Sequence, residues 1–350
     1  MNSPELRYKD TNFITGLRAF AALAVVMIHT GGAGLRSFGV IGSRLADSGS
    51  AGVYVFFVIS GFAVSQSFES SNSYQYYLVK RLRRIVPLYF FWLSVCILWS
   101  GGASAYSILM HVTFLSFLDI QVANSIIGIE WTIPIEIFYY LLIPAVLIWA
   151  RRLPTLCLIT LLALTLHLIF QFLAALSGDK TSLLRLHWSP IPYAFSFSLG
   201  MLAYRLKQTW NPKPWQSYAA WAASAAILVA YAIKPGAFKF LRIDALVLFS
   251  SISFIIITST TDSNNIISRS VLCSRPIQYL GLWSYGIYLA HLPLNGIVVS
   301  NFSLTPFPNF LATSALTIAI SALTYYLIER PGQRWRAKVE SKHDIKMASA

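Results

Sequence analysis

Long apolar runs alternate with short polar and basic segments along the whole chain. At 1.5 Å per helical residue, about ten of these runs approach or exceed the length that crosses a ~30 Å hydrocarbon layer. They cover residues 13–30, 51–67, 85–100, 131–150, 153–175, 190–204, 216–233, 243–260, 279–300 and 307–328. Because backbone groups in a bilayer must be bonded within their own segment, the pattern predicts an all-α, polytopic integral membrane helical bundle.

An additional segment, 105–118, is ambiguous because it is barely long enough to cross and contains His111 and Thr113. If it does not cross, about 20 of the 27 Lys and Arg residues fall on the cytosolic side, whereas crossing leaves about 12 there. The positive-inside rule therefore predicts about ten transmembrane helices, with 105–118 re-entrant or interfacial. It also predicts a multi-pass protein of the cell (inner or cytoplasmic) membrane with both termini cytosolic.

Composition agrees with this organisation and excludes a soluble protein. Hydrophobic residues make up 56% and charged residues 11%, against about 25% charged residues in a typical soluble domain. A net charge of +14 would suggest nucleic acid in a soluble protein, but here the basic residues lie between spans, so membrane lipids are expected and nucleic acid is not. The predicted divisions are a cytosolic N-terminus at 1–12, a transmembrane domain at 13–331 and a basic cytosolic tail at 332–350.

Cysteine usage gives no sign of a disulfide framework or a metal centre. Cys96, Cys157 and Cys273 lie in or beside apolar runs, and no two of them form a Cys-x-x-Cys pair. No metal site is expected.

Three ionisable residues inside the predicted spans are candidates for function, because such groups are costly in a membrane. His29 lies ~16 Å and His291 ~24 Å from the inner face, and Glu136 lies ~21 Å from it. These similar depths allow a His–Glu pair, in which the carboxylate orients the ring and the imidazole acts as a general base. The alternatives are a snorkelling or helix-bridging His29, or a proton relay in a transporter.

A basic run at 80–87 opens the third predicted span. Arg81 and Arg84 are three residues apart and share one helix face, where two guanidinium groups suit a phosphate. The alternative is a topology anchor without a ligand.

Small and polar residues also mark helix faces that should not meet lipid. Ser60-Gly61 interrupts an aromatic run and predicts close approach of another helix. A polar stripe along the 279–300 span predicts a cavity wall or a helix contact; it consists of Ser284, Tyr285, Tyr288 and His291.

Six segments, in this order, resemble the motifs of the membrane acyltransferase-3 family. They are Arg18 with ten residues before His29, the FVISGF run at 57–62, the RLRRIVP run at 81–87, the EWTIPIEIFYY run at 130–140, the LGLWSYGIYLAHLP run at 280–293 and the ERP end at 329–331. The resemblance covers residues 13–331. One departure is Pro134, which stands where the family usually has an ordinary residue.

The resemblance implies transfer of an acyl group, most often acetyl, from acyl-CoA to a hydroxyl of an extracytoplasmic or lipid-linked carbohydrate such as O-antigen or exopolysaccharide. Acetyl-CoA would be a co-substrate, with no permanently bound cofactor. By the same resemblance, His29 would be catalytic and Glu136 its support, while the CoA phosphates would bind Arg18, Arg81 and Arg84. Candidates for acceptor binding or support of the site are Ser60, Trp131, Ser284, Tyr285, Tyr288 and His291.

The alternative function is a proton-coupled secondary transporter or flippase for a small anion or glycolipid, using the same His and Glu residues. Against it, the sequence shows no internal repeat and no matched pair of broken spans.

Overall fold

The computed structural model describes residues 11–240 and 244–333, and these residues form helices without any strand. Most of the predicted N-terminal segment 1–12 and tail 332–350 lies outside the described residues. The helices are α2 Asn12–His29, η1 Gly32–Phe38, α3 Gly39–Asp47, η2 Ser48–Ala51, α4 Gly52–Glu69, α5 Tyr74–Trp99, α6 Ala105–Val112, η3 Ser116–Leu118, α7 Thr132–Trp149, α8 Leu153–Ser177, α9 Lys180–Trp188, η4 Ile191–Tyr193, α10 Ala194–Thr209, α11 Pro214–Ile233, α12 Pro235–Phe240, α13 Ala245–Ser259, η5 Ser268–Leu272, α14 Arg275–Leu282, α15 Ser284–Asn301, α16 Pro306–Thr324 and η6 Tyr325–Glu329.

The predicted all-α polytopic bundle is confirmed, and every predicted span contains a helix, although the 279–300 span is divided between α14 and α15. Seven helical stretches are long and apolar enough to cross a membrane, by length and composition; they are Asn12–His29, Gly32–Glu69, Tyr74–Trp99, Thr132–Trp149, Leu153–Ser177, Pro214–Ile233 and Pro306–Gln333. The three other predicted spans are α10, α13 and α15, with 16, 15 and 18 residues. The ambiguous segment contains only the eight-residue α6 and η3, which is too short to cross as a helix.

Two helix boundaries differ from the sequence pattern. The third span does not open at the basic run: α5 begins at Tyr74, because Ser73 caps it by accepting a hydrogen bond from the Tyr76 N–H at 3.2 Å. Arg81 and Arg84 therefore lie inside α5 rather than at its start. The stretch between the first two predicted spans forms η1, α3 and η2, with Gly31 at φ 86° permitting the turn out of α2.

Glycine contacts bring the central helices unusually close together. A Cβ on Gly61 of α4 would lie 2.3 Å from the Phe197 carbonyl oxygen of α10, which confirms the close approach predicted at Ser60-Gly61. Similarly, a Cβ on Gly52 would lie 2.4 Å from the carbonyl oxygen of Ala21 in α2. Because the Gly52 contact pairs the second half of α2 with the start of α4, His29 lies at the end of the bundle where α4 begins.

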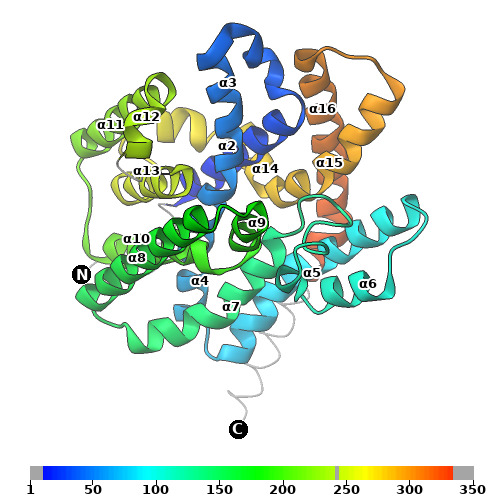
Figure 1. Ribbon diagram of the computed structural model, residues 1–350. Coiled ribbons are helices and arrows are strands. Elements are labelled where there is room, and N and C mark those ends of the chain that lie inside the picture. The colour runs from blue at the N-terminus through cyan, green and yellow to red at the C-terminus, as the bar shows by residue number, and fades with distance from the viewer. Residues whose placement is uncertain (1–10, 241–243, 334–350) are drawn as a thin grey trace.

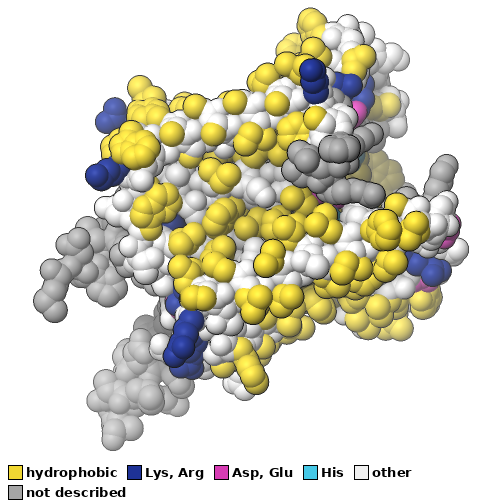
Figure 2. Space-filling view, turned by 60° about the vertical axis from the view of Figure 1, so that its left-hand side comes forward, with side chains coloured by type: hydrophobic (Ala, Val, Ile, Leu, Met, Phe, Trp, Pro, Cys, Tyr) yellow, Lys and Arg dark blue, Asp and Glu magenta, His cyan; other side chains and the backbone are white. Residues whose placement is uncertain are grey.

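The helices surround α2, which stands near the centre of the bundle in Figure 1 with α15 and α16 to its right. Hydrophobic side chains cover the middle of the face shown in Figure 2, while Lys and Arg side chains gather toward its edges. Such an apolar face with charges at its margins is what a helical bundle presents to a bilayer.

Candidate active site

Two cavities that share four lining residues run along α4. The larger, here called the basic cavity, has a volume of about 590 Å³ and lies where α2 and α5 begin and where α4 and η6 end. Its charged lining residues are Arg18, Lys80, Arg81, Arg83, Arg84 and Glu329. Five cations against one carboxylate make this cavity suited to a polyanionic ligand.

The smaller, here called the central cavity, has a volume of about 70 Å³ and shares Arg18, Ala63, Arg81 and Arg84 with the basic cavity. It extends along α4 as far as Val53 and is otherwise lined mainly by apolar and aromatic side chains. The predicted site residues that line it are Arg18, Ser60, Arg81, Arg84, Glu136, Ser284, Tyr285 and Tyr288. The two cavities together form a passage from a cationic mouth to an apolar interior.

Glu136 brings a carboxylate to the wall of the central cavity. Its Oε1 accepts hydrogen bonds from Ser60 Oγ at 2.9 Å and from Tyr140 OH at 2.7 Å. Pro134 does not disturb this geometry, because α7 begins at Thr132 and a proline in the first turn removes no intrahelical bond. Two O–H donors therefore fix the carboxylate and leave its other oxygen, Oε2, available.

The three predicted arginines differ in how firmly the protein holds them. Arg81 donates to the Ala63 carbonyl oxygen and lies over the Tyr140 ring, 5.8 Å from its centroid. Arg18 Nε donates to Ser284 Oγ at 3.2 Å. Arg84 makes no hydrogen bond or ion pair with another residue that the structure describes, so its guanidinium is the most available of the three for a ligand.

His29 pairs with His291. His29 Nδ1 lies 2.8 Å from the Val25 carbonyl oxygen and 3.1 Å from His291 Nε2, while His291 Nδ1 lies 2.6 Å from the Tyr288 carbonyl oxygen. Since a carbonyl oxygen only accepts, both Nδ1 atoms carry hydrogen, and the single His29 Nδ1–H is shared between the Val25 carbonyl oxygen and His291 Nε2. The unprotonated nitrogen of a neutral His29 is therefore Nε2, which is the atom that can take up a proton.

The expected contact between His29 and Glu136 is not formed: Glu136 is bonded to α4 and to its own helix, whereas His29 is bonded to α15. Tyr288 contacts the histidine pair and shares a cavity wall with Glu136. It lines the central cavity, and its ring centroid is 6.0 Å from that of His291. The histidine pair thus lies beyond the end of the central cavity rather than beside the carboxylate.

Comparison with known proteins shows to which family the chain belongs. Residues 11–326 match the acyltransferase-3 family, described as an acyltransferase domain. The chain belongs to the acyltransferase-3 family. It is 25% identical over 330 residues to Nodulation protein 10 of Rhizobium leguminosarum bv. viciae, covering 82% of this chain and 83% of that protein. It is also 25% identical over 289 residues to ORF330 of Acidianus two-tailed virus, named as a candidate acetyltransferase, covering 80% of this chain and 82% of that protein. No solved structure matches.

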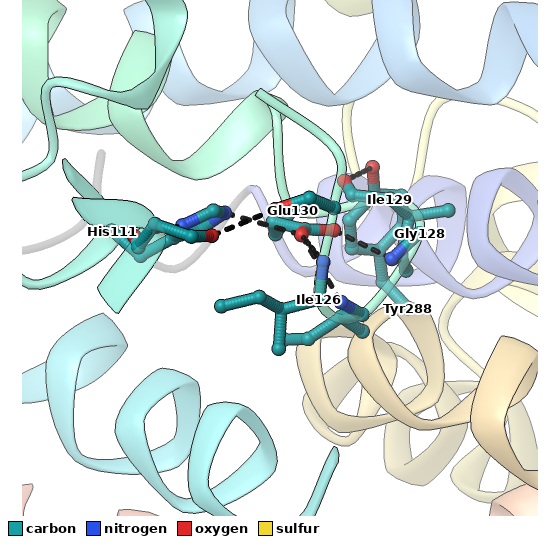
Figure 3. A network of polar contacts seen from close by, with 9 residues as sticks. His111, Ile126, Gly128, Ile129, Glu130 and Tyr288 are labelled. Carbon is teal, nitrogen blue, oxygen red and sulfur yellow. Dashed lines mark hydrogen bonds and ion pairs between the residues drawn. The ribbon is translucent and has the colours of Figure 1, made fainter. Parts of the chain in front are cut away.

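The protein is thus a membrane acyltransferase, and its structure contains a further polar network that the sequence pattern did not reveal (Figure 3). Glu130 is fully buried and accepts hydrogen bonds from the backbone N–H groups of residues 126, 127 and 128 at 2.6–3.1 Å. His111 Nε2 lies 3.2 Å from the same carboxylate, and its Nδ1 donates to the Ser107 carbonyl oxygen at 2.7 Å. The sequence signals are a carboxyl in a loop just before an apolar span and the place of Glu130 at the start of the EWTIPIEIFYY run at 130–140.

This network fixes the loop that leads into α7 of the acyltransferase. Tyr288 OH accepts from Thr132 Oγ1 at 3.0 Å and donates to the Ile129 carbonyl oxygen at 2.9 Å, so α15 holds the same loop from its other side. The loop sets where Thr132 enters the central cavity and, one turn later, where Glu136 lies.

Two other predicted residues have mainly packing contacts. Trp131 lines neither cavity; its ring packs against Phe57, His187 and Tyr193, with centroids 4.8–6.4 Å apart. Tyr285 lines the central cavity, but its hydroxyl donates to the Ile85 carbonyl oxygen at 3.0 Å. Their predicted part in acceptor binding remains a prediction.

Proposed function

We propose that this protein is an acyl-CoA-dependent O-acyltransferase that moves an acyl group, by preference acetyl, to a hydroxyl of a carbohydrate. The observation that carries the proposal is the passage from the basic cavity into the central cavity, in a chain of an acyltransferase family. A CoA thioester has the matching form, with phosphates at one end and a thin arm that ends in the acyl group.

In this proposal the CoA phosphates bind in the basic cavity, with Arg84 as the principal contact and Arg18 and Arg81 at the junction of the cavities. Guanidinium groups hold phosphates by paired charge-assisted hydrogen bonds. The pantetheine arm then runs along α4, where the carboxylate of Glu136 accepts a hydrogen bond from an amide N–H of the arm. The thioester reaches the end of the central cavity near Tyr288.

His29 is the proposed general base. The hydroxyl proton of the acceptor moves to His29 Nε2 as the hydroxyl oxygen bonds to the thioester carbonyl carbon. The C–S bond then breaks, and the proton returns from His29 to the leaving thiolate, which gives free CoA and the O-acyl product. His291 is a positioning residue, because its Nε2 accepts from His29 Nδ1 and so keeps the base nitrogen unprotonated.

We also propose that the basic cavity opens to the cytosol in the cell membrane. This orientation follows from the distribution of Lys and Arg between the spans and matches the side on which acyl-CoA is made. His29 and the start of α4 then lie toward the opposite side, where an extracytoplasmic acceptor arrives.

The test is acetyl transfer in sealed inside-out membrane vesicles that carry wild type, His29→Ala or Arg151→Ala. Acetyl-labelled acetyl-CoA is added outside the vesicles, on the cytosolic face. Total cell-surface glycan of the host, enclosed in the vesicle lumen, serves as the acceptor pool. We expect label in the glycan with wild type and with Arg151→Ala, which removes an exposed positive charge that lines neither cavity. We expect none with His29→Ala.

Two results would contradict the proposal. Label that persists with His29→Ala removes the catalytic assignment of that residue. A purified wild-type protein that consumes no thioester, but moves an anion or glycolipid across vesicles, identifies a transporter instead.

A further inference from the structure

A third cavity, here called the lateral cavity, has a volume of about 310 Å³ and lies between α4, α8, α9 and α13. With a water occupying about 30 Å³ of liquid, it has room for roughly ten waters. Tyr54 near the start of α4 is one of its lining residues, whereas the basic cavity meets α4 from Ala63 onward. Nine residues separate Tyr54 from Ala63, which is ~14 Å along a helix, so the two cavities lie toward opposite ends of α4.

The polar groups of the lateral cavity are held together across two distant segments. His167 Nε2 donates to Asp244 Oδ2 at 2.9 Å, and Gln171 Nε2 donates to the same oxygen at 3.2 Å. Asp244 also caps α13, since its Oδ1 accepts from the Val247 N–H at 2.9 Å. All three cavity residues are ionisable or amide side chains within or at the end of apolar helices, where polar groups mark functional sites by default.

One of these groups lacks a partner. The His167 residue is 1% exposed, and no other described residue forms a hydrogen bond with its Nδ1. That atom has almost no accessible surface even toward the cavity, so the polar group that a ligand in the cavity can reach is the Asp244 carboxylate, whose side chain is 36% exposed. A ligand hydroxyl can donate a hydrogen bond to this carboxylate.

The remaining walls are aromatic and aliphatic side chains, namely Tyr54, His187, Tyr193, Leu184, Leu186, Pro192 and Leu246. Tyr54 and Tyr193 stack with ring centroids 6.3 Å apart, and His187 packs on Trp131 at 4.8 Å. A pocket with apolar ring walls and a few convergent polar groups suits a small molecule that has both an apolar face and several hydroxyls. The carboxylate of Asp244 disfavours an anionic ligand such as a phosphate.

The lateral cavity also adjoins the central cavity. Phe57 lines the central cavity, and its ring centroid is 4.8 Å from that of Tyr193, which lines the lateral cavity. A single aromatic layer thus separates a polar cavity at one end of α4 from the passage that begins at the other end.

We propose that the lateral cavity binds a sugar residue of the acceptor, with hydroxyls bonded to Asp244 and the ring packed on Tyr54 and Tyr193. This inference rests on the proposed function, because it names where the acceptor of that reaction is held. Gln171 helps to orient Asp244 and is a positioning residue.

The test compares wild type with Asp244→Asn in the purified full-length protein. Asparagine caps a helix as well as aspartate does, so this variant keeps α13 intact. It removes the charge and alters the hydrogen bonds that Oδ2 accepts from His167 and Gln171. The probes are the methyl glycosides of glucose, mannose, galactose and rhamnose, whose binding is measured by saturation-transfer NMR. We expect at least one glycoside to bind wild type and its affinity to fall about tenfold in Asp244→Asn.

Asp262→Asn is the matched control. Asp262 Oδ1 likewise accepts a backbone N–H, that of Phe13 at 2.8 Å, but Asp262 lines none of the three cavities. We expect wild-type affinity in this variant. Gln171→Leu provides a second change in the cavity and should weaken the same glycoside without loss of folded protein.

The second readout is acetyl transfer to the host glycan used above, because further residues of a glycan chain held in the lateral cavity can extend to His29. We expect Asp244→Asn to raise the acceptor KM about tenfold and to leave the acetyl-CoA KM within twofold of wild type. A purely structural role for Asp244 would change both constants together.

The outcomes separate this inference from the proposed function. If no glycoside binds wild type, or if binding is unchanged in Asp244→Asn, the sugar site is overturned. If binding depends on Asp244 but no acetyl group is transferred from acetyl-CoA, the sugar site stands and the proposed reaction fails. If transfer depends on His29 but the acceptor KM is unchanged in Asp244→Asn, the reaction stands and the sugar site fails.

Discussion

The region around Glu130 and the region around Glu136 and His29 contrast in how completely their hydrogen bonds are satisfied. Around Glu130 every partner is protein: three backbone N–H groups and His111 surround a carboxylate that is fully buried. Around Glu136 and His29, by contrast, Glu136 Oε2 and His29 Nε2 have no hydrogen-bond partner among the residues that the structure describes. The closed network has no capacity left for a substrate, so it stabilises a loop. The open groups retain the lone pairs that chemistry needs.

The largest effect should come from removing the open imidazole. We expect His29→Ala to lower acetyl transfer by about 10²–10⁴-fold, the range that a positioned general base contributes. The thermal midpoint in detergent should stay near that of wild type, because His29 is an exposed residue at the end of α2. Added imidazole should restore part of the activity. Full activity in His29→Ala would assign the base to another residue.

The closed network predicts the opposite pattern, a loss of stability with little loss of chemistry. In Glu130→Gln the amide NH₂ faces backbone N–H groups that previously met a carboxylate oxygen, and the His111 contact loses its charge. Breaking a buried pair of this kind costs about 3–5 kcal/mol. We expect a clearly lower thermal midpoint, with transfer per folded molecule close to wild type.

Glu136→Gln is the control for this comparison. The side-chain oxygen that remains still accepts from Ser60 and Tyr140, and the residue is only partly buried. Its midpoint should therefore stay near wild type while transfer falls. Equal destabilisation by both variants would remove the distinction between the two regions.

The same contrast separates two arginines of the basic cavity. Arg84→Ala removes a guanidinium that is free for phosphate, so we expect the acetyl-CoA KM to rise about tenfold, equivalent to one charge-assisted hydrogen bond. Arg81→Ala removes the cation that bonds to Ala63 and covers Tyr140, and should lower the thermal midpoint as well. Steady-state kinetics and melting curves on both variants check this. An unchanged KM in Arg84→Ala would place the phosphates elsewhere.

The elements of the bundle could be predicted from the sequence, because apolar run length and the cost of unbonded backbone leave few alternatives in a membrane. The close helix contact at Gly61 could be predicted for a similar reason, since small residues in an aromatic run have few other uses. The start of α5 could not be predicted from the apolar run, because Ser73 caps this helix from outside that run.

The pairing within the site could not be predicted, for a geometric reason. Counting residues from the inner face gives the depth of His29 and Glu136 but not the direction in which each helix turns its side chain. Similar depths allowed a direct pair, whereas in the structure His29 bonds to His291 and Glu136 bonds to Ser60. Glu130 was missed because three of its four partners are backbone N–H groups, which have no signature in the sequence.

The smallest effect should come from Ser60→Ala, which tests how tightly the open carboxylate must be held. This change removes one of the two O–H donors to Glu136 and leaves Tyr140 in place. A hydrogen bond to a charged group contributes about 1.5–3 kcal/mol, but water that enters the central cavity can replace the lost donor in part. We expect transfer to fall only a few-fold, with the acetyl-CoA KM more affected than kcat, because Glu136 is proposed to contact the pantetheine arm.

Adding Tyr140→Phe to Ser60→Ala should then cause a larger loss than the sum of the two single losses, since the carboxylate would have no protein donor left. A double variant whose loss equals the sum of the single losses would mean that Glu136 does not depend on these two hydroxyls to hold its position.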